Sequence, residues 1–272
     1  MPAAGLLLAL GTVLGLREVV VSSTQPDPLT PGLVAGLAML AAAGLVGGLV
    51  RAPVVVGMAL AAPGAWVIVT DGGLADVGWV RLLVGVGAAV GGVLAAAFDR
   101  RWRTSGAPPI VLAVSVAGLY GAVPETMHVS VLLGVALPVA LLGLGAVASL
   151  GSAGAYVSTA LLAWTAGIGG AARPSSIVGG LGCLGLLVVE PLARNLAGGR
   201  SGLEAISRRW GLIALAAIQV VLVAIASRVA GVQRSAGVAA LVVFADLGLA
   251  TALAVGGGRA LMARGGRSEQ EV

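Results

Sequence analysis

The sequence predicts an all-helical membrane protein, and three observations support that class. Hydrophobic residues make up 58% of the chain and charged residues only 10%, whereas about 25% charged residues is usual in soluble domains. The mean hydropathy is +1.06, and a soluble fold of 272 residues could not bury so much apolar surface. The apolar residues also form long uninterrupted runs, which excludes the alternating strands of about ten residues in a membrane β-barrel. We therefore expect a polytopic bundle of transmembrane helices.

A helix needs about twenty apolar residues to cross roughly 30 Å of hydrocarbon. By this length, the chain contains about ten predicted spans in a single transmembrane domain, residues 1–258. The spans are 3–21, 30–50, 52–70, 77–98, 107–124, 129–150, 154–171, 175–193, 210–229 and 236–257. The first lacks the basic segment of a secretory signal, so we expect it to be retained as a span.

Turn residues separate the spans, in the segments "SSTQPDP", "DGGLAD" and "PETMH". Pro124 disfavours helical geometry at the preceding residue and ends the fifth span. Pro63 and Pro138 fall inside spans, where proline removes a backbone hydrogen bond and is expected to kink the helix. Small residues at a spacing of four allow close helix packing in lipid. Two such pairs are Gly44 with Gly48 and Gly87 with Gly91.

The placement of arginine predicts the orientation in the cell membrane, because cytoplasmic loops carry an excess of basic residues. All sixteen basic residues are arginine, and a cytoplasmic N-terminus places eleven of them inside and five outside. An even number of spans returns the C-terminus to the cytoplasm, where residues 259–272 form a basic tail that we expect to be disordered. The segment 194–209 is expected to include a short interfacial helix, with Leu203 and Ile206 facing lipid.

Ten spans divide into two groups of five, residues 1–124 and 129–258. An odd number of spans in each group gives the two halves opposite orientations, as in inverted-repeat carriers. The halves show no convincing residue-level similarity. In span number and size the chain resembles the ten-helix drug/metabolite carriers, although the resemblance is one of architecture and includes no shared motif.

Two polar residues in the middle of predicted spans are candidate ion or substrate ligands. Asp246 is about ten residues, or roughly 15 Å, from either end of the last span, where a carboxylate costs at least about 2.5–3.5 kcal/mol on insertion scales. It is interpreted either as a proton or cation site or as a protonated carboxyl that hydrogen-bonds between helices. Gln219 is central in the ninth span, and its amide is expected to bond to a neighbouring helix, with Asp246 as one available partner.

Glu190 and Arg194 stand four residues apart near the inner end of the eighth span. A glutamate before an arginine at this spacing lies on the same helical face, in the order that favours an ion pair. The pair is interpreted either as an interfacial salt bridge that closes the helix end or as an inner gate.

The segment "YGAVPETMHVSV" holds Glu125 and the only histidine, His128. Glu125 or Thr126 can begin the sixth span with an acceptor where backbone amides are free, so a helix end and turn is the favoured interpretation. The alternatives are an outward-facing ion or substrate gate and, less favoured, catalysis. A hydrolase needs a nucleophile oriented by a base and a third group, and no such set surrounds this pair.

Two functional hypotheses remain open, and a third is less favoured. The first is a secondary carrier or permease for a small solute or ion, proton-coupled through Asp246. The second is a non-transporting subunit or scaffold in a larger envelope or transport complex, with other membrane subunits as partners. An intramembrane enzyme acting on lipid is disfavoured because no paired acidic motif occurs. Nucleic-acid binding is excluded, because aromatic residues are 3% and no basic soluble module exists. The single Cys183 and the lack of ligand spacing predict no internal disulfide, no metal and no cofactor.

Overall fold

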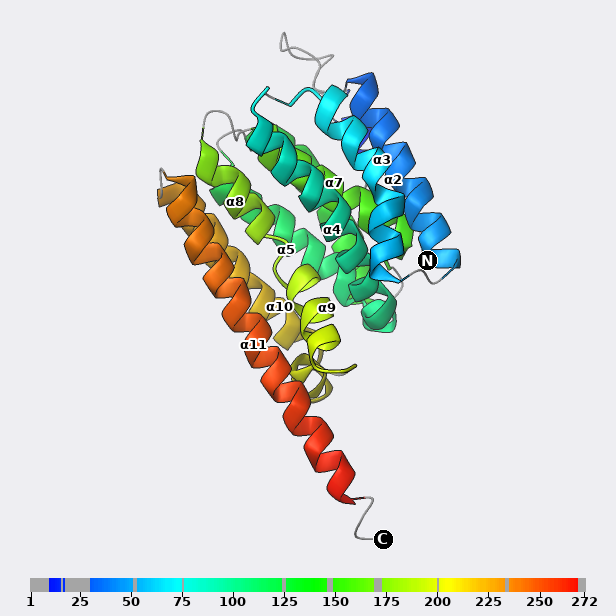
Figure 1. The fold of residues 1–272 in the computed structure, drawn as a ribbon, viewed down its shortest axis with the longest axis vertical. Helices are drawn as coiled ribbons and strands as arrows, with labels where there is room; N and C mark the ends of the chain where they lie inside the picture. The colour runs from blue at the N-terminus through cyan, green and yellow to red at the C-terminus, as the bar shows by residue number, and fades with distance from the viewer. Residues whose placement is uncertain are drawn as a thin grey trace.

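The structure is a computed structural model, and it describes residues 10–15, 17, 30–50, 53–74, 76–123, 126–145, 149–168, 173–199, 201–232 and 235–268. These residues form α-helices and one short 3₁₀ helix, and they contain no β-strand. The predicted all-helical class is therefore confirmed. Figure 1 shows the helices packed side by side in one bundle, with the C-terminal part of α11 (Ala236–Ser268) extending beyond it.

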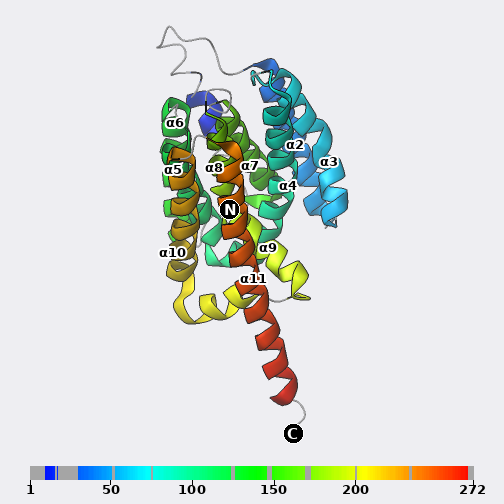
Figure 2. The ribbon, with the colours of Figure 1, turned by 60° about the vertical axis from the view of Figure 1, so that its left-hand side comes forward.

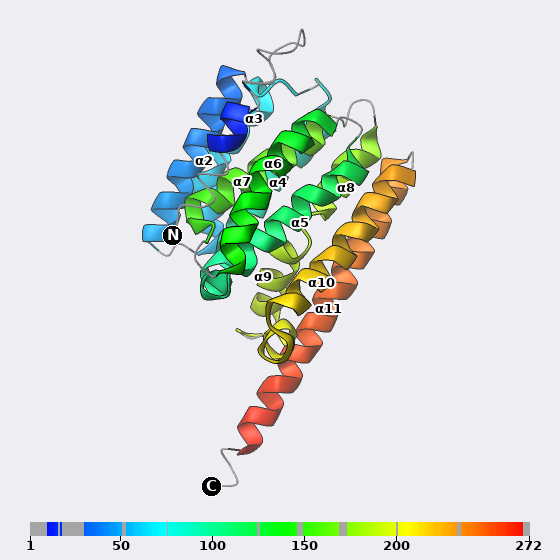
Figure 3. The same cartoon turned by 180° about the vertical axis from the view of Figure 1, so that it is seen from behind.

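The other α-helices are α2 (Pro31–Leu49), α3 (Val54–Asp71), α4 (Gly78–Trp102), α5 (Ala107–Ala122), α6 (Thr126–Leu144), α7 (Gly151–Ile168), α8 (Pro174–Gly182), α9 (Leu186–Leu196) and α10 (Gly202–Val232). The 3₁₀ helix η1 (Arg103–Ser105) follows α4 directly. Seen from behind, α6, α5, α10 and α11 follow one another across one face of the bundle (Figure 3).

Five helical stretches of the described residues are long and apolar enough to cross a membrane. They are Pro31–Leu49, Val54–Asp71, Gly78–Ser105, Gly211–Val232 and Ala236–Gly257. A sixth is obtained if α8 and α9, which are bent by 59° at a short break, count as one span. Several apolar helices thus support a membrane protein, whereas the count of ten spans and the division into inverted halves stay predictions.

Helix α7 lies inside the bundle, and glycines on its neighbours let them approach it closely. The α7 side chains from Ala153 to Gly167 are all buried. A methyl group at Gly44 of α2 would lie 2.7 Å from the Cα atom of Ala153, and one at Gly92 of α4 would lie 3.0 Å from the Tyr156 ring. These distances leave no room for a side chain, so the helices meet backbone to backbone, as helices in lipid commonly do.

The other glycines that the sequence singles out also lie against neighbouring helices. An added Cβ atom would lie 2.8 Å from Ser152 at Gly48, 2.5 Å from Leu181 at Gly87 and 3.2 Å from Leu184 at Gly91. Pro63 and Pro138 lie inside α3 and α6 as predicted, and both helices continue past them.

One end of the bundle, here called the arginine-rich end, holds the C-terminal ends of α4 and α9 and the start of α10. Its described arginine side chains are Arg100, Arg101, Arg103 and Arg194. Helix α10 has a non-helical residue at Gly211, with φ 62° and ψ −147°, and its first segment lies across this end (Figure 2). Leu203 in that segment is 6% exposed and belongs to the core. The expectation that Leu203 faces lipid is therefore wrong, because the segment turns this side chain toward the bundle.

Candidate functional site

The break between α8 and α9 interrupts a helix inside the bundle. Helix α8 ends at Gly182 and α9 begins at Leu186, and Gly185 between them has φ +40° and ψ −115°. A Cβ atom at Gly185 would lie 2.4 Å from the side-chain oxygen of Gln219. Glycine is thus required at position 185 for two reasons: the backbone has a positive φ, and the Gln219 amide approaches too closely for a side chain to fit.

Gln219 of α10 makes three hydrogen bonds, two of them to backbone groups at this break. Its Oε1 accepts from the backbone N–H of Leu186 at 2.7 Å, and its Nε2 donates to the carbonyl oxygen of Cys183 at 3.0 Å. Nε2 also donates to the Ser115 hydroxyl of α5 at 2.9 Å. Gln219 and Ser115 are fully buried, so one amide satisfies a donor and an acceptor that the break would otherwise leave unpaired in an apolar interior. We call this arrangement the Gln219 joint.

Asp246, the expected alternative partner of Gln219, makes no hydrogen bond to it. It lies on the stripe of α11 that includes the buried residues Ala239, Val243 and Ala254, but it is only partly buried. None of the hydrogen bonds or ion pairs found among the described residues involves Asp246. Its position is therefore intermediate: the carboxyl is on the bundle side of α11 without being sealed in a packed core.

A second polar group, here called the Glu190 cluster, lies at the arginine-rich end. Glu190 of α9 is fully buried, and neither of its carboxyl oxygens has a hydrogen-bond partner. The Trp102 indole lies beside Glu190. Three charged groups are close enough to Glu190 to act on its carboxyl electrostatically: Arg194, Glu204 and Arg101. The indole Nε1 is also buried and does not meet hydrogen-bond geometry with the carboxyl. A buried carboxyl without a partner is rare in proteins and calls for a physical explanation.

The two arginines of the cluster are placed closest to Glu204 of α10. Arg101 Nη2 lies 3.1 Å from Glu204 Oε2, and Arg194 Nε lies 3.9 Å from Glu204 Oε1. Glu204 is only 8% exposed, while Arg101 is 45% and Arg194 is 24% exposed, so the cluster reaches the surface through its arginines. Glu190 and Arg194 are on one face of α9, as their spacing requires, but the cation lies nearer to Glu204.

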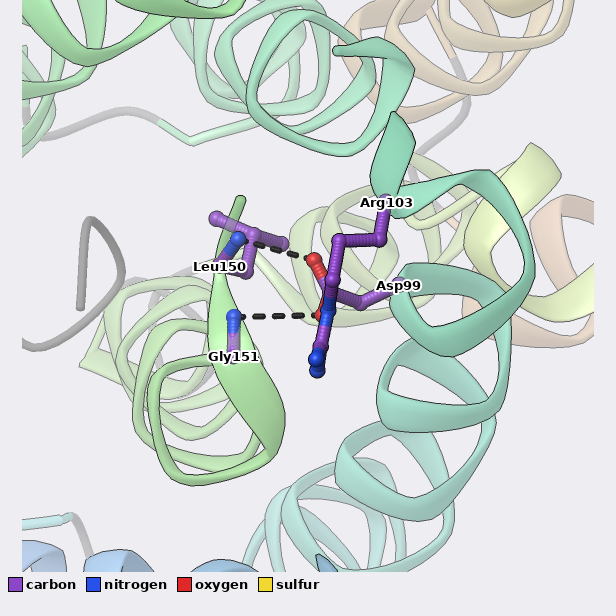
Figure 4. A network of polar contacts seen from close by, with 4 residues as sticks. All are labelled: Asp99, Arg103, Leu150 and Gly151. Carbon is purple, nitrogen blue, oxygen red and sulfur yellow. Dashed lines mark hydrogen bonds and ion pairs between the residues drawn. The ribbon is translucent and has the colours of Figure 1, made fainter. Parts of the chain in front are cut away.

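Asp99 of α4 is a site residue that the sequence analysis missed. It is fully buried, and its carboxylate accepts hydrogen bonds from the backbone N–H groups of Leu150 at 2.8 Å and Gly151 at 3.2 Å. These amides open α7, so Asp99 caps the positive end of another helix (Figure 4). Arg103 completes the network at 3.5 Å. One signal in the sequence points to this role: an acid at the C-terminal end of a helix opposes that helix's own dipole and needs a partner elsewhere.

His128 lies at the opposite end of the bundle, near the start of α6. Glu125 lies outside the described residues. His128 is 8% exposed and packs edge-to-face on Trp164 of α7, with ring centroids 5.9 Å apart. The Trp164 indole donates to the carbonyl oxygen of Gly72 at 2.7 Å. These contacts tie the start of α6 to α7 and to the end of α3, which agrees with a packed helix end.

The structure thus brings Glu190 and Arg194 together in one cluster, and it leaves Gln219, Asp246 and His128 at separate places. No group of three or more potential metal ligands occurs among the residues with described positions. The sequence matches no protein-family model, no curated protein and no solved structure.

Proposed function

We propose that this chain is a secondary carrier for a small solute, proton-coupled through Asp246, and that its moving part is the interrupted helix α8–α9. The observation that carries the proposal is the Gln219 joint. A helix break in lipid is costly unless its backbone groups find partners, and carriers use such breaks to present backbone groups to a substrate or coupling ion.

The joint offers a means of coupling binding to movement. A single side chain holds both halves of the broken helix, at Cys183 and at Leu186. A solute that takes over the hydrogen bonds of Gln219 would release the two halves. Such a solute would bind the released state more tightly than the closed state, and this difference in affinity is what shifts a conformational equilibrium.

The same proposal includes the topology. Nine helical segments, with α8–α9 taken as one, coincide in position with nine of the ten predicted spans, and we assign residues 3–21 as the tenth. We place the arginine-rich end on the cytoplasmic side of the cell membrane, because basic residues are in excess on that side of membrane proteins. Both chain termini are then cytoplasmic.

Reconstitution of the purified protein into liposomes that enclose a pH-sensitive dye tests this function. Labelled amino acids, sugars, nucleosides and organic cations are added one class at a time, with and without a pH gradient. We expect one class to move together with protons, and we expect Asp246→Asn to abolish that coupling because the amide cannot carry a proton. Asp76→Asn is the matched control, since Asp76 is 90% exposed and should leave the flux unchanged.

Full flux in both Asp246→Asn and Asp246→Ala would contradict coupling through this carboxyl. A lack of flux for every solute class would favour a second function, that of a non-transporting subunit in a larger membrane complex. A specific observation supports this alternative. Helices α9 and α11 border an apolar groove of about 770 Å³, and a side chain at Gly248 or Gly256 in it would meet only open space.

The subunit function predicts that a partner helix covers this groove. Gly248→Leu with Gly256→Leu would then remove a co-purifying membrane protein, while Gly134→Leu would not. Gly134 is the matched control because it also borders open space but lies on α6. Purification of the unmodified chain as a stable lone monomer would contradict the subunit function.

A further inference from the structure

We infer that Glu190 is a second proton-binding site, built into the arginine-rich end by the Glu190 cluster. An ionised carboxylate that is fully buried costs several kcal/mol unless it is paired and hydrogen-bonded. Glu190 is fully buried and both of its oxygens lack a hydrogen-bond partner. The structure therefore holds this side chain in the arrangement that suits its neutral, protonated form.

The positions of the two neighbouring arginines support this assignment. An ionised Glu190 would be expected to draw the nearest cation into an ion pair, yet Arg101 and Arg194 both have Glu204 as their nearest carboxylate. The Arg101 contact is short, at 3.1 Å, whereas the Arg194 contact is long, at 3.9 Å. Arg194 is thus only loosely held by Glu204.

The structure also supplies a partner for the ionised form of Glu190. Arg194 follows Glu190 by four residues on the same helix, in the order that favours pairing, and it is the cation with the largest effect on Glu190. Loss of the proton from Glu190 would bring Arg194 across from Glu204 to Glu190. Glu204 would then keep only Arg101, so the tie between α9 and α10 would weaken as the proton leaves.

The described charged and polar groups that act on Glu190 come from three helices. Helix α4 supplies Arg101 and the Trp102 indole, α9 supplies Arg194, and α10 supplies Glu204. Ser201, just before α10, is also buried with an unpartnered hydroxyl. Because Arg101 is 45% exposed, water reaches the edge of the cluster and can exchange the proton. The inference deepens the carrier proposal by naming a proton site at the end that we place in the cytoplasm, but the geometry of the site does not depend on transport.

Trp102 provides a direct readout, because its indole lies beside the carboxyl. The fluorescence of the purified protein in nanodiscs is titrated over about pH 4 to 9, and the same titration of Trp102→Phe is subtracted to isolate the contribution of Trp102. We expect one protonation transition in this difference signal, and we expect Glu190→Gln to remove it. Asp76→Asn is the control and should retain the transition.

Arg194→Gln is the second variant, and it tests the proton site if Glu190→Gln does not fold. Without this cation the ionised form of Glu190 is less favourable, so the transition should move by about one pH unit or more to higher pH. An unchanged transition in Glu190→Gln, or an unmoved one in Arg194→Gln, would overturn the proton site. The fluorescence titration needs no solute, so it tests the proton site separately from transport. A protonation transition without solute flux supports the proton site and rejects the carrier proposal. Solute flux without a protonation transition supports the carrier proposal and rejects the proton site.

Discussion

Asp99→Ala is expected to lower the free energy of unfolding by about 2–6 kcal/mol, because two buried backbone amides lose the carboxylate that accepts their hydrogen bonds. The carboxylate is fully buried and accepts from the amides of Leu150 and Gly151. Without it, two backbone donors at the start of α7 lose their partners, and each such loss costs about 1–3 kcal/mol. Because α7 packs against α4 and α2, loosening its first turn should destabilise that part of the bundle.

The measurement is the denaturation midpoint in detergent, together with the amount of protein that inserts into the membrane fraction. The denaturation midpoint of Asp99→Asn should fall between those of Asp99→Ala and the unmodified protein, because an amide oxygen can still accept one of the two hydrogen bonds. Asp76→Ala is the control, since its ion pair with Arg81 is exposed and worth about 0–1 kcal/mol. A midpoint for Asp99→Ala equal to that of the unmodified protein would show that the cap does not stabilise α7.

Gln219→Leu is expected to open the α8–α9 joint and to make Cys183 reactive. Leucine has a similar volume but cannot bond to Leu186 or Cys183, so two buried backbone groups lose their partners at a cost of about 1–3 kcal/mol each. The two losses together come to about 2–6 kcal/mol, and every 1.4 kcal/mol changes a population tenfold, so the opened state should rise by roughly 25-fold or more. Cys183 is the only cysteine and is fully buried, which makes its labelling by N-ethylmaleimide a direct measure of opening.

Three variants serve as controls for this labelling. Gln219→Glu keeps the acceptor for the Leu186 amide and should label more slowly than Gln219→Leu. Ser227→Ala lies on the same helix, where the Ser227 hydroxyl bonds only to the Ala224 carbonyl oxygen, and should label like the unmodified protein. Cys183→Ser should not label at all. Equal labelling rates in Gln219→Leu and in the unmodified protein would mean that the amide does not hold the joint closed, and the carrier proposal would lose its main support.

Individual residues show how far sequence reasoning reaches in this protein. Pro63 and Pro138 were placed inside helices, and Gly44, Gly87 and their partners against other helices, because these are local properties of a residue type in lipid. The polar residue Gln219 was expected to bond to another helix, and it does. Its actual partners could not be named in advance, since Leu186 is 33 residues away and Ser115 is 104 residues away.

The helix break itself also escaped prediction. The segment "GGLGCLGLLVV" reads as one continuous apolar run, and its four glycines do not mark a break in a chain that has 44 glycines, many of them inside helices. The break forms at Gly185 because an amide from α10 is available there to satisfy it. Asp99 was overlooked for a related reason, because its neighbours in the sequence are arginines and its two amide partners come from 51 and 52 residues away.

The sequence alone determined that this chain is helical and roughly where its helices begin and end, and its apolar runs indicate a membrane protein. Composition and the length of apolar runs decide these properties, since the cost of exposing backbone or charge to lipid applies to each segment separately. Only the tertiary structure decided which polar groups meet. A helix that is apolar on all sides has no apolar stripe that marks its inward face. Packing against the other helices therefore sets how the helix is rotated about its axis, and this rotation decides which partner each buried polar side chain meets.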